Sequence, residues 1–255
     1  MAYQANGVTF DGTNDYLQAS TTPGTDSDKL LFSGWLRRNS TGTGQTILCE
    51  SGIRYYFRFQ GSDVLRISAV NSSGTTVVDI ESSAITDTVN WIHIATAIDL
   101  SVPVAHLYVN GVSDLATTTT LTSSATMDFT TNYSSVGSVI GGDLKFDGDM
   151  ADIWFGPGQF LDLSVAANLR KFYGPNGGAV DLGADGSTPT GVQPAQYFTG
   201  ATATWHNNVG SQGSFGENGA LTDAATDPPT EPDTSSLVLE RGLGRGIQRG
   251  IMRGV

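Results

Sequence analysis

Short stretches in which hydrophobic and polar residues alternate dominate the first two thirds of the chain. In RYYFRFQ, residues 54–60, every second position is an aromatic residue, namely Tyr55, Phe57 and Phe59. The stretch WIHIATAIDL, residues 91–100, alternates in the same way. A period of two is typical of β-strands that place one face in a hydrophobic core. The pattern therefore predicts antiparallel strands with an apolar inner face and a more polar outer face.

Pairs of residues that favour tight turns separate these stretches. Asn, Asp and Gly tolerate the positive φ angles that the tightest hairpins require. Such pairs are Asp11-Gly12, Asn110-Gly111, Gly141-Gly142 and Asp147-Gly148. Strands are thus predicted from residue 7 to about residue 156, which indicates an all-β protein, an antiparallel jelly-roll sandwich.

One stretch departs from this pattern. LSVAANLRKFY, residues 163–173, consists largely of helix formers, and Gly174-Pro175 follows it directly. Because glycine and proline end helices, the sequence predicts a helix here. The chain is then predicted to divide into four parts. These are a jelly roll at 1–173, a Gly/Pro-rich loop or β-hairpin extension packed on it at 174–227, a Pro-rich acidic linker at 228–239 and a basic Arg/Gly arm at 240–255.

Composition and charge sharpen this division. Only 15% of the residues are charged and 32 of 255 are glycine, which suits short strands joined by turns. Residues 1–236 hold nine of the 13 basic and 24 of the 25 acidic residues, a net charge of −15, whereas residues 237–255 have a net charge of +3. An acidic body repels nucleic acid, and a basic end is attracted to acidic protein. We therefore expect protein partners and no nucleic acid.

The cysteine content and the N-terminus bear on where the chain is made. Cys49 is the only cysteine, so no internal disulfide and no cysteine-based metal site are expected. The first residues, MAYQANGVTF, contain neither a basic nor an apolar signal segment, and no apolar run reaches 18 residues. We expect a chain that is made in a reducing cytoplasm and does not enter a membrane.

Several short motifs carry a resemblance to a known family. Between residues 7 and 172 they are VTFDGTNDYLQ, FSGWLRR, ILCESG, WIHIATAIDL, LYVNGV and GGDLKFDGDMADIWF. In this order they resemble the laminin-G-like, concanavalin A-like lectin/glucanase jelly-roll superfamily. Residues 175–227 are similar to an extension of jelly-roll proteins that tailed bacteriophages encode. The resemblance implies a lectin-like fold and a place in a virion.

The same resemblance raises the question of catalysis. Glycoside hydrolases of this fold carry paired carboxylates, typically E-x-D-x-x-E on one strand. None of the five glutamates has such neighbours, and the nearest acidic cluster is Asp147, Asp149 and Asp152. The sequence also contains no nucleophile elbow, P-loop or zinc-protease motif. We therefore expect no catalytic residues.

Calcium is the one cofactor that the sequence indicates, because many relatives of this fold bind it. Ca²⁺ takes roughly six to eight oxygen ligands. Candidate ligands are Asp11, Asn14 and Asp15, joined by Asp147 and Asp149 if the first and last strands pair. The alternative is that these residues only form turns, in which Asp-Gly and Asn-Asp are common.

A glycan site requires an exposed aromatic ring beside a few polar groups. The outer face of the RYYFRFQ strand offers Arg54, Tyr56 and Arg58, and Arg66 follows on the next predicted strand. Trp205, which lies outside the jelly-roll motifs, is a further candidate for sugar contact. The same outer face equally suits an ordinary solvated surface or the interface with a partner subunit.

The final segment, LVLERGLGRGIQRGIMRGV, places arginine at every fourth residue with glycine between. A helix would hold five of these glycines, at a cost of about 5 kcal/mol. As an extended strand, the segment has one face of alternating charged and aliphatic side chains and another of almost bare backbone. We expect a strap that becomes ordered against another subunit. Its predicted contact residues are Arg241, Leu243, Arg245, Ile247, Arg249, Ile251 and Arg253.

These features predict a non-enzymatic viral structural protein, located in the virion and made in the host cytoplasm. The first hypothesis is a phage capsid decoration (cement) protein that displays its lectin-like domain and binds the major capsid protein or another virion subunit through its arm. The alternative is a tail fibre or receptor-binding lectin that recognises a host surface glycan. A divergent glycanase is the third hypothesis. A homo-oligomer, for example a trimer, suits the first two.

Overall fold

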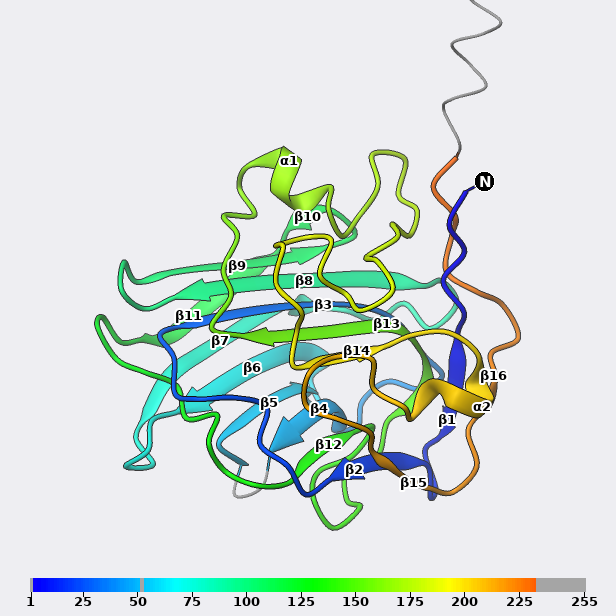
Figure 1. Ribbon diagram of the computed structural model, residues 1–255, viewed down its shortest axis with the longest axis horizontal. Coiled ribbons are helices and arrows are strands. Elements are labelled where there is room, and N and C mark those ends of the chain that lie inside the picture. Colours follow the sequence, from blue (N-terminus) through cyan, green and yellow to red (C-terminus); the bar gives the residue numbers. More distant parts are fainter. Residues whose placement is uncertain (1, 51–52, 233–255) are drawn as a thin grey trace, which may run out of the picture.

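The computed structural model describes residues 2–50 and 53–232, which form two antiparallel β-sheets packed face to face (Figure 1). Sheet A contains, in spatial order, β10 (Val112–Ser113), β9 (Val104–Val109), β8 (Ile92–Asp99), β3 (Lys29–Arg38), β13 (Asp147–Pro157), β1 (Val8–Asp11) and β16 (Thr222–Asp223), with β14 (Gln196–Phe198) also paired to β13. Sheet B contains β11 (Leu115–Leu121), β7 (Thr76–Ala84), β6 (Val64–Val70), β5 (Tyr55–Phe59), β4 (Gln45–Glu50), β12 (Ser134–Val136), β2 (Tyr16–Ala19) and β15 (Gly216–Asn218). The predicted all-β jelly-roll sandwich is confirmed.

The hydrophobic core lies between the sheets and follows the alternation of the sequence. Tyr55, Phe57 and Phe59 of β5 are fully buried in this core. The ring of Tyr55 stacks on Phe155 of β13 in the opposite sheet, with centroids 5.0 Å apart. Each fully buried phenylalanine stabilises the fold by about 1.5–3 kcal/mol relative to an exposed one. Period-two alternation is thus a correct guide to the inner faces.

The outer face of sheet A is covered rather than solvated. Every residue of β8 is buried, including Ala95 and Ala97, which belong to an apolar cluster outside the main core. The Nε1 atom of Trp154 on β13 donates a 2.8 Å hydrogen bond to the carbonyl oxygen of Gly186 in the covering segment. The expectation of a polar outer face is wrong for this sheet, because the chain between β13 and β14 adds a second apolar layer. Its side chains in this layer are Phe160, Leu161, Leu163, Leu169, Phe172 and Leu182.

The extension predicted at 174–227 contributes strands to both sheets. β14 pairs with β13 and β16 pairs with β1, both in sheet A, whereas β15 pairs with β2 in sheet B. A single-turn helix, α2 (Thr202–Trp205), lies between β14 and β15. The strands of the extension are therefore integral to the sandwich and do more than pack on its surface.

The helix predicted at 163–173 is reduced to one turn, α1 (Ala166–Leu169). Leu163 before it and Phe172 after it are buried in the apolar layer over sheet A. Helix propensity is a weak preference, and the burial of these two flanking side chains outweighs it. The prediction is correct in place and wrong in length.

The predicted tight turns are confirmed in part. Positive φ angles occur at Gly12, Asn110, Gly111, Gly141 and Gly142. The turn predicted at Asp147-Gly148 is wrong, because both residues belong to β13 and pair with β1. A Cβ atom on Gly148 would lie 2.1 Å from the carbonyl oxygen of Arg37. Glycine is required there for the close approach of two strands.

The linker predicted at 228–239 is docked on the body over the part that the structure describes. The side-chain amide of Gln4 donates a 3.0 Å hydrogen bond to the carbonyl oxygen of Pro228. The Glu231 carboxylate accepts a 3.1 Å hydrogen bond from the backbone N–H of Gly178. In Figure 1 this segment runs beside the N-terminal residues. Its beginning is therefore a fixed part of the body and not a free spacer.

Three further expectations concern the chain as a whole. Within the described ranges, no helix is long and apolar enough to cross a membrane. Cys49 is a buried free thiol, and burial raises its pKa to about 12. Outside the described residues lie the predicted arm contacts Arg241, Leu243, Arg245, Ile247, Arg249, Ile251 and Arg253.

Candidate functional site

The outer face of sheet B carries charged side chains on strands β5, β6 and β7. The register of these strands places Arg58 directly opposite Arg66, which in turn lies opposite Glu81. In the next row, Tyr56 of β5 and Asp79 of β7 lie on either side of β6. Side chains in such rows are close enough to interact. Polar side chains from three strands thus share this face. The sequence predicted those of β5 and β6 but not the carboxylates of β7.

Two carboxylates hold Arg66 in place. Its Nε and Nη2 atoms donate hydrogen bonds of 2.7 and 2.6 Å to the two carboxylate oxygens of Asp79. Glu81 lies 3.7 Å from the same Nε atom. The hydrogen bonds that Arg66 donates to Asp79 raise the pKa of Arg66 above its ordinary value. A bidentate pair of this kind fixes both the charge and the orientation of the guanidinium.

Arg58 lies on the same face, but an aromatic ring and not a carboxylate contacts its guanidinium. Its guanidinium carbon lies over the Tyr56 ring, 4.5 Å from the ring centroid, where the electron-rich face attracts the cation. Unlike its neighbours Arg54 and Arg66, it has no hydrogen-bond acceptor or carboxylate partner within residues 2–50 and 53–232. Tyr56 is only 8% exposed. The tyrosine ring therefore supports the Arg58 guanidinium and is not an open plate for a sugar.

Arg54 continues this surface at the start of β5. Its Nε atom lies 3.6 Å from a carboxylate oxygen of Asp128, in the segment before β12. Its backbone N–H donates a 3.2 Å hydrogen bond to Glu50. Glu50 is buried, and this burial raises its pKa to about 7. The residues predicted for a glycan site on β5 thus form one continuous polar surface with partners from three other segments.

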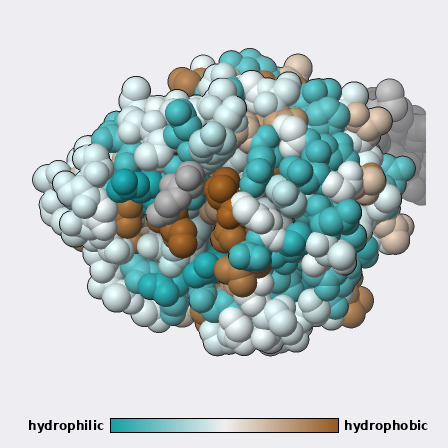
Figure 2. Space-filling model, turned by 90° about the horizontal axis from the view of Figure 1, so that it is seen from below, coloured by the Kyte–Doolittle hydropathy of each residue, from teal (hydrophilic) through white to brown (hydrophobic). Residues whose placement is uncertain are grey.

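The β4 side of sheet B is less polar. Residues 137–145 cross it, and the thiol of Cys49 donates a 3.5 Å hydrogen bond to the carbonyl oxygen of Ser138 in this loop. Leu144 of the loop is 41% exposed, and Ile53 beyond β4 is 51% exposed. Figure 2 shows the lower side of the molecule, where apolar side chains gather among polar ones. The charged rows of β5 to β7 therefore have an apolar neighbour.

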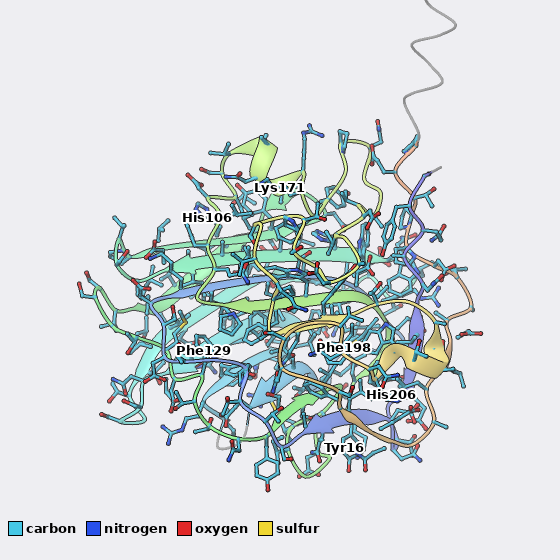
Figure 3. The ribbon with its side chains drawn as sticks, in the orientation of Figure 1. Tyr16, His106, Phe129, Lys171, Phe198 and His206 are labelled. Carbon is cyan, nitrogen blue, oxygen red and sulfur yellow. The ribbon has the colours of Figure 1, made fainter. Side chains whose placement is uncertain are left out.

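Trp205 is not available to a ligand. Its side chain is fully buried, with its ring centroid 5.8 Å from that of Phe10 and 5.2 Å from that of Phe198. Figure 3 shows Phe198 inside the sandwich, on the core side of α2. The prediction that Trp205 contacts a sugar is wrong, because one turn of helix directs the indole into the core.

The candidate calcium ligands lie near the point where β1 pairs with β13, the pairing on which the calcium hypothesis depended, with Asp11 opposite Asp147. Asp11 accepts three backbone hydrogen bonds from the turn that contains Asn14 and Asp15. Burial opposes these donors, yet they hold the pKa of Asp11 below its ordinary value. Among the described residues, no three His, Cys, Asp or Glu side chains gather to hold a metal ion. The hydrogen bonds of Asp11 fit turn formation, the alternative interpretation.

The acidic residues of β13 each contact a different segment. Asp149 forms a 2.5 Å ion pair with Arg37 of β3. Asp152 lies in a bulge of the strand with a φ of 47°, where the hydroxyl of Tyr3 donates to its carboxylate at 3.0 Å. Burial raises the pKa of Asp152 to about 6. Asp147 accepts a 2.8 Å hydrogen bond from the Ser40 hydroxyl. These carboxylates join β13 to its surroundings.

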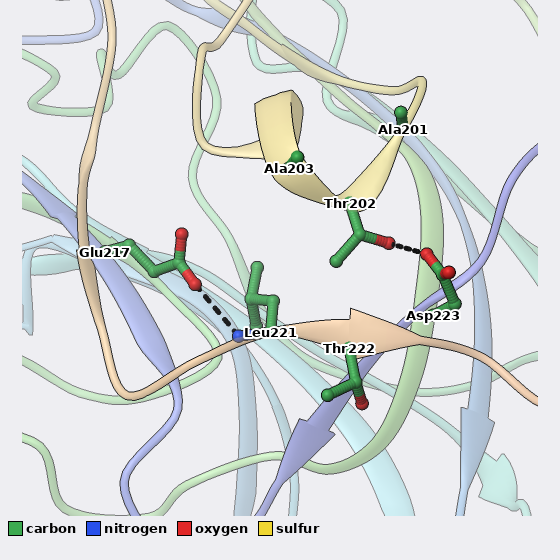
Figure 4. Close-up of a pocket in the computed structure, with 7 residues that line it drawn as sticks. All are labelled: Ala201, Thr202, Ala203, Glu217, Leu221, Thr222 and Asp223. Carbon is green, nitrogen blue, oxygen red and sulfur yellow. Dashed lines mark hydrogen bonds between the residues drawn. The ribbon is translucent and has the colours of Figure 1, made fainter.

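An open cleft of about 570 Å³ lies between α2 and β16 (Figure 4). Glu217 and Asp223 line it on opposite sides of Leu221. Glu217 accepts the Leu221 N–H at 2.9 Å, and the Thr202 hydroxyl donates to Asp223. Sequence reasoning missed this cleft because its residues meet only when β15 and β16 join different sheets. Both carboxylates have protein donors, so the cleft is a weaker candidate site than the outer face of sheet B.

Comparison with known structures supports the fold. A protein from Bacteroides ovatus ATCC 8483, designated as carbohydrate binding, has a TM-score of 0.59 at 14% identity over 88% of this chain and 62% of its own. The heptameric SAP-like pentraxin from Limulus polyphemus has a TM-score of 0.55 at 11% identity over 87% of this chain and 95% of its own. This chain thus spans less than two thirds of the length of the Bacteroides protein.

Comparison of sequences identifies the family. No curated protein sequence matches the chain. Residues 11–157 match the family described as the concanavalin A-like lectin/glucanases superfamily. This match covers more than half of the 255 residues and includes β2 to β13, with most of the paired strands of both sheets. The chain therefore belongs to the concanavalin A-like lectin/glucanases superfamily.

Proposed function

We propose that this protein is a non-enzymatic glycan-binding protein whose ligand lies on the outer face of sheet B. One observation carries the proposal: Arg58, Arg66 and the Tyr56 ring that supports Arg58 form a fixed polar surface on the partly exposed outer face of β5 and β6. Glycan sites need a few polar groups held in place before the ligand arrives. The carbohydrate-binding designation of the Bacteroides ovatus protein of similar fold adds support.

A glycan array probed with the full chain tests this proposal. We expect saturable binding to a subset of glycans. The variant Tyr56→Ala removes the support of Arg58 and should lose most of this binding. Because Tyr56 is only 8% exposed, the melting temperature of the variant has to be measured beside the array. Loss of binding in a variant that still melts cooperatively supports the site, whereas undiminished binding places the ligand elsewhere.

The proposal assigns no turnover to the protein. It predicts that a bound oligosaccharide is recovered intact after prolonged incubation, as judged by mass spectrometry. Product formation that disappears in Asp147→Asn or Asp149→Asn would instead support a divergent glycanase.

We further propose that the glycan-binding domain is displayed on a phage particle by the C-terminal arm. The viral setting rests on the resemblance of residues 175–227 and on the opposite charges of the body and the arm. The docked residue Glu231 supports this arrangement, because it fixes the point from which the remaining chain continues. A capsid decoration protein that binds the major capsid protein is the first form of this proposal, and a tail fibre is the second.

A co-sedimentation assay tests the attachment. The full chain and a truncation at residue 239 are each mixed with phage particles stripped of this protein. We expect the full chain to sediment with the particles and the truncation to remain in the supernatant. Equal sedimentation of both proteins would assign attachment to the body, and sedimentation of neither would contradict the virion proposal while leaving the glycan proposal standing.

A further inference from the structure

Arg58 differs from the other basic side chains of the described residues. Residues 2–50 and 53–232 contain nine Lys and Arg side chains, and seven of them contact a protein oxygen. The two without such a contact are Arg58 and Arg170. Arg170 is exposed to solvent, which satisfies its donors, whereas Arg58 is half-buried over the Tyr56 ring. Arg58 therefore presents preorganised hydrogen-bond donors that no part of the described chain uses.

The neighbour across the strand places a second guanidinium beside Arg58. Arg58 lies directly opposite Arg66 on β6, and like charges directly opposite one another destabilise a sheet. Asp79 and Glu81 pair with Arg66, whereas no carboxylate in the described residues contacts Arg58. An anion bound at Arg58 would relieve the repulsion and would accept two parallel hydrogen bonds from the guanidinium.

The charge of the surrounding surface permits an anionic ligand here. The body carries a net charge of −15 over residues 1–236, which repels anions from most of its surface. The outer face of sheet B is an exception. Its three arginines balance the three carboxylates of Asp79, Glu81 and Asp128, and the fourth carboxyl group, that of Glu50, is buried, which raises its pKa to about 7.

We propose that the ligand of this face is an acidic glycan and that Arg58 binds the carboxylate of one of its sugars. This inference rests on the proposed glycan-binding function and names the ligand class of the same site. A neutral sugar offers hydroxyl groups to the guanidinium but no charged partner in contact with it. A carboxylate provides both the charge and the bidentate geometry.

Isothermal titration calorimetry of the full chain with matched acidic and neutral sugars tests the proposal. The pairs are trigalacturonic acid with its full methyl ester, and 3′-sialyllactose with lactose. The two pairs distinguish uronic acids from sialic acids as the source of the carboxylate. In at least one pair we expect the acidic member to bind at least tenfold more tightly than the neutral one, and its affinity to fall as salt increases.

Two variants of matched chemistry complete the test. Arg58→Gln should weaken binding of the acidic sugar at least tenfold and should bring the ratio of acidic to neutral affinity close to one. Arg170→Gln removes the other arginine without a protein partner and should change neither. Equal affinity for the members of both pairs, or undiminished acid binding by Arg58→Gln, overturns the inference.

The outcome for the ligand class is separable from the outcome for the function. If the glycan array identifies only neutral ligands, the inference about acidic sugars fails and the glycan-binding function stands. If neither the array nor calorimetry detects any glycan, the glycan-binding function fails and the inference fails with it.

Discussion

The outer faces of the two sheets differ although both belong to strands with the same alternation. On sheet A, the outward residues Ala95 and Ala97 of β8 are completely buried under the segment between β13 and β14. On sheet B, the outward residues Arg58 of β5 and Arg66 of β6 remain partly exposed. Small apolar side chains allow a second layer to pack closely, whereas covering charged side chains would remove them from water at a high cost. The difference leaves sheet B as the sheet face at which a soluble ligand has access.

The largest effect is expected from removing part of the cover of sheet A. Phe172 is buried in this layer, and its ring lies 5.4 Å from that of Trp154 in an edge-to-face arrangement. Phe172→Ala should lower the free energy of unfolding by about 3–5 kcal/mol, because the cavity adds to the lost burial. Urea denaturation followed by tryptophan fluorescence measures the change. Val192→Ala, at a residue that is 57% exposed, should stay within about 0.5 kcal/mol of the parent chain.

The second largest effect is a dependence of the unfolding free energy on pH, which follows from the burial of β8 beneath the segment between β13 and β14. His93 of β8 is fully buried, with Nε2 2.8 Å from the Ser33 hydroxyl, and burial lowers its pKa to about 3. Below pH 6.5 the unfolded chain binds a proton at this histidine and the folded chain does not, so stability is lost as the pH falls towards 3. Between pH 7 and pH 5 the loss from His93 alone should be about 2 kcal/mol.

A comparison with His93→Gln isolates this contribution. Glu50 and Asp152 have raised pKa values, which favour the folded state as the pH falls, so the total pH dependence mixes opposite signs. These two residues are present in both proteins, and their contributions cancel in the difference. Urea denaturation at pH 7 and pH 5 should therefore show a smaller loss of stability for His93→Gln than for the parent chain. Equal losses would mean that the cover over β8 admits water.

The contrast between the faces also separates what the sequence could predict from what it could not. Alternation predicted the inner face of β5, because burial in the core and period two are directly linked. The same alternation in β8 did not predict the cover, since it says nothing about a layer formed by residues more than 60 positions later. The pairing of Asp11 with Asp147 was predicted as a condition of the calcium hypothesis, but the turn donors that occupy Asp11 depend on backbone geometry. The burial of Trp205 depends on α2, whose four residues are too few for a periodic pattern.

The third prediction concerns the charge balance of the open face. Asp79→Asn keeps the shape of the side chain and removes the charge that holds Arg66. We expect a loss of about 1 kcal/mol in unfolding free energy, since Arg66 is one third exposed and solvent screens the pair. The same variant should bind trigalacturonic acid more tightly than the parent chain, because a second guanidinium becomes available beside Arg58. Weaker acid binding would show that Arg66 has to be held in its present position.

The smallest expected effect distinguishes a functional residue from a structural one. Arg58 has no acceptor in the described part of the chain and lies opposite Arg66, so Arg58→Gln removes a repulsion together with the cation-π contact over Tyr56. The two changes oppose each other, and each is worth roughly 0.5–1 kcal/mol at a partly exposed site. The unfolding free energy should therefore change by less than about 0.5 kcal/mol, as for the control Arg170→Gln. Urea denaturation of the three proteins at low salt measures this difference.

A loss of 2 kcal/mol or more would indicate that Arg58 stabilises sheet B, and its effect on ligand binding would then be indirect. An unchanged stability together with lost acid binding would assign Arg58 to the ligand.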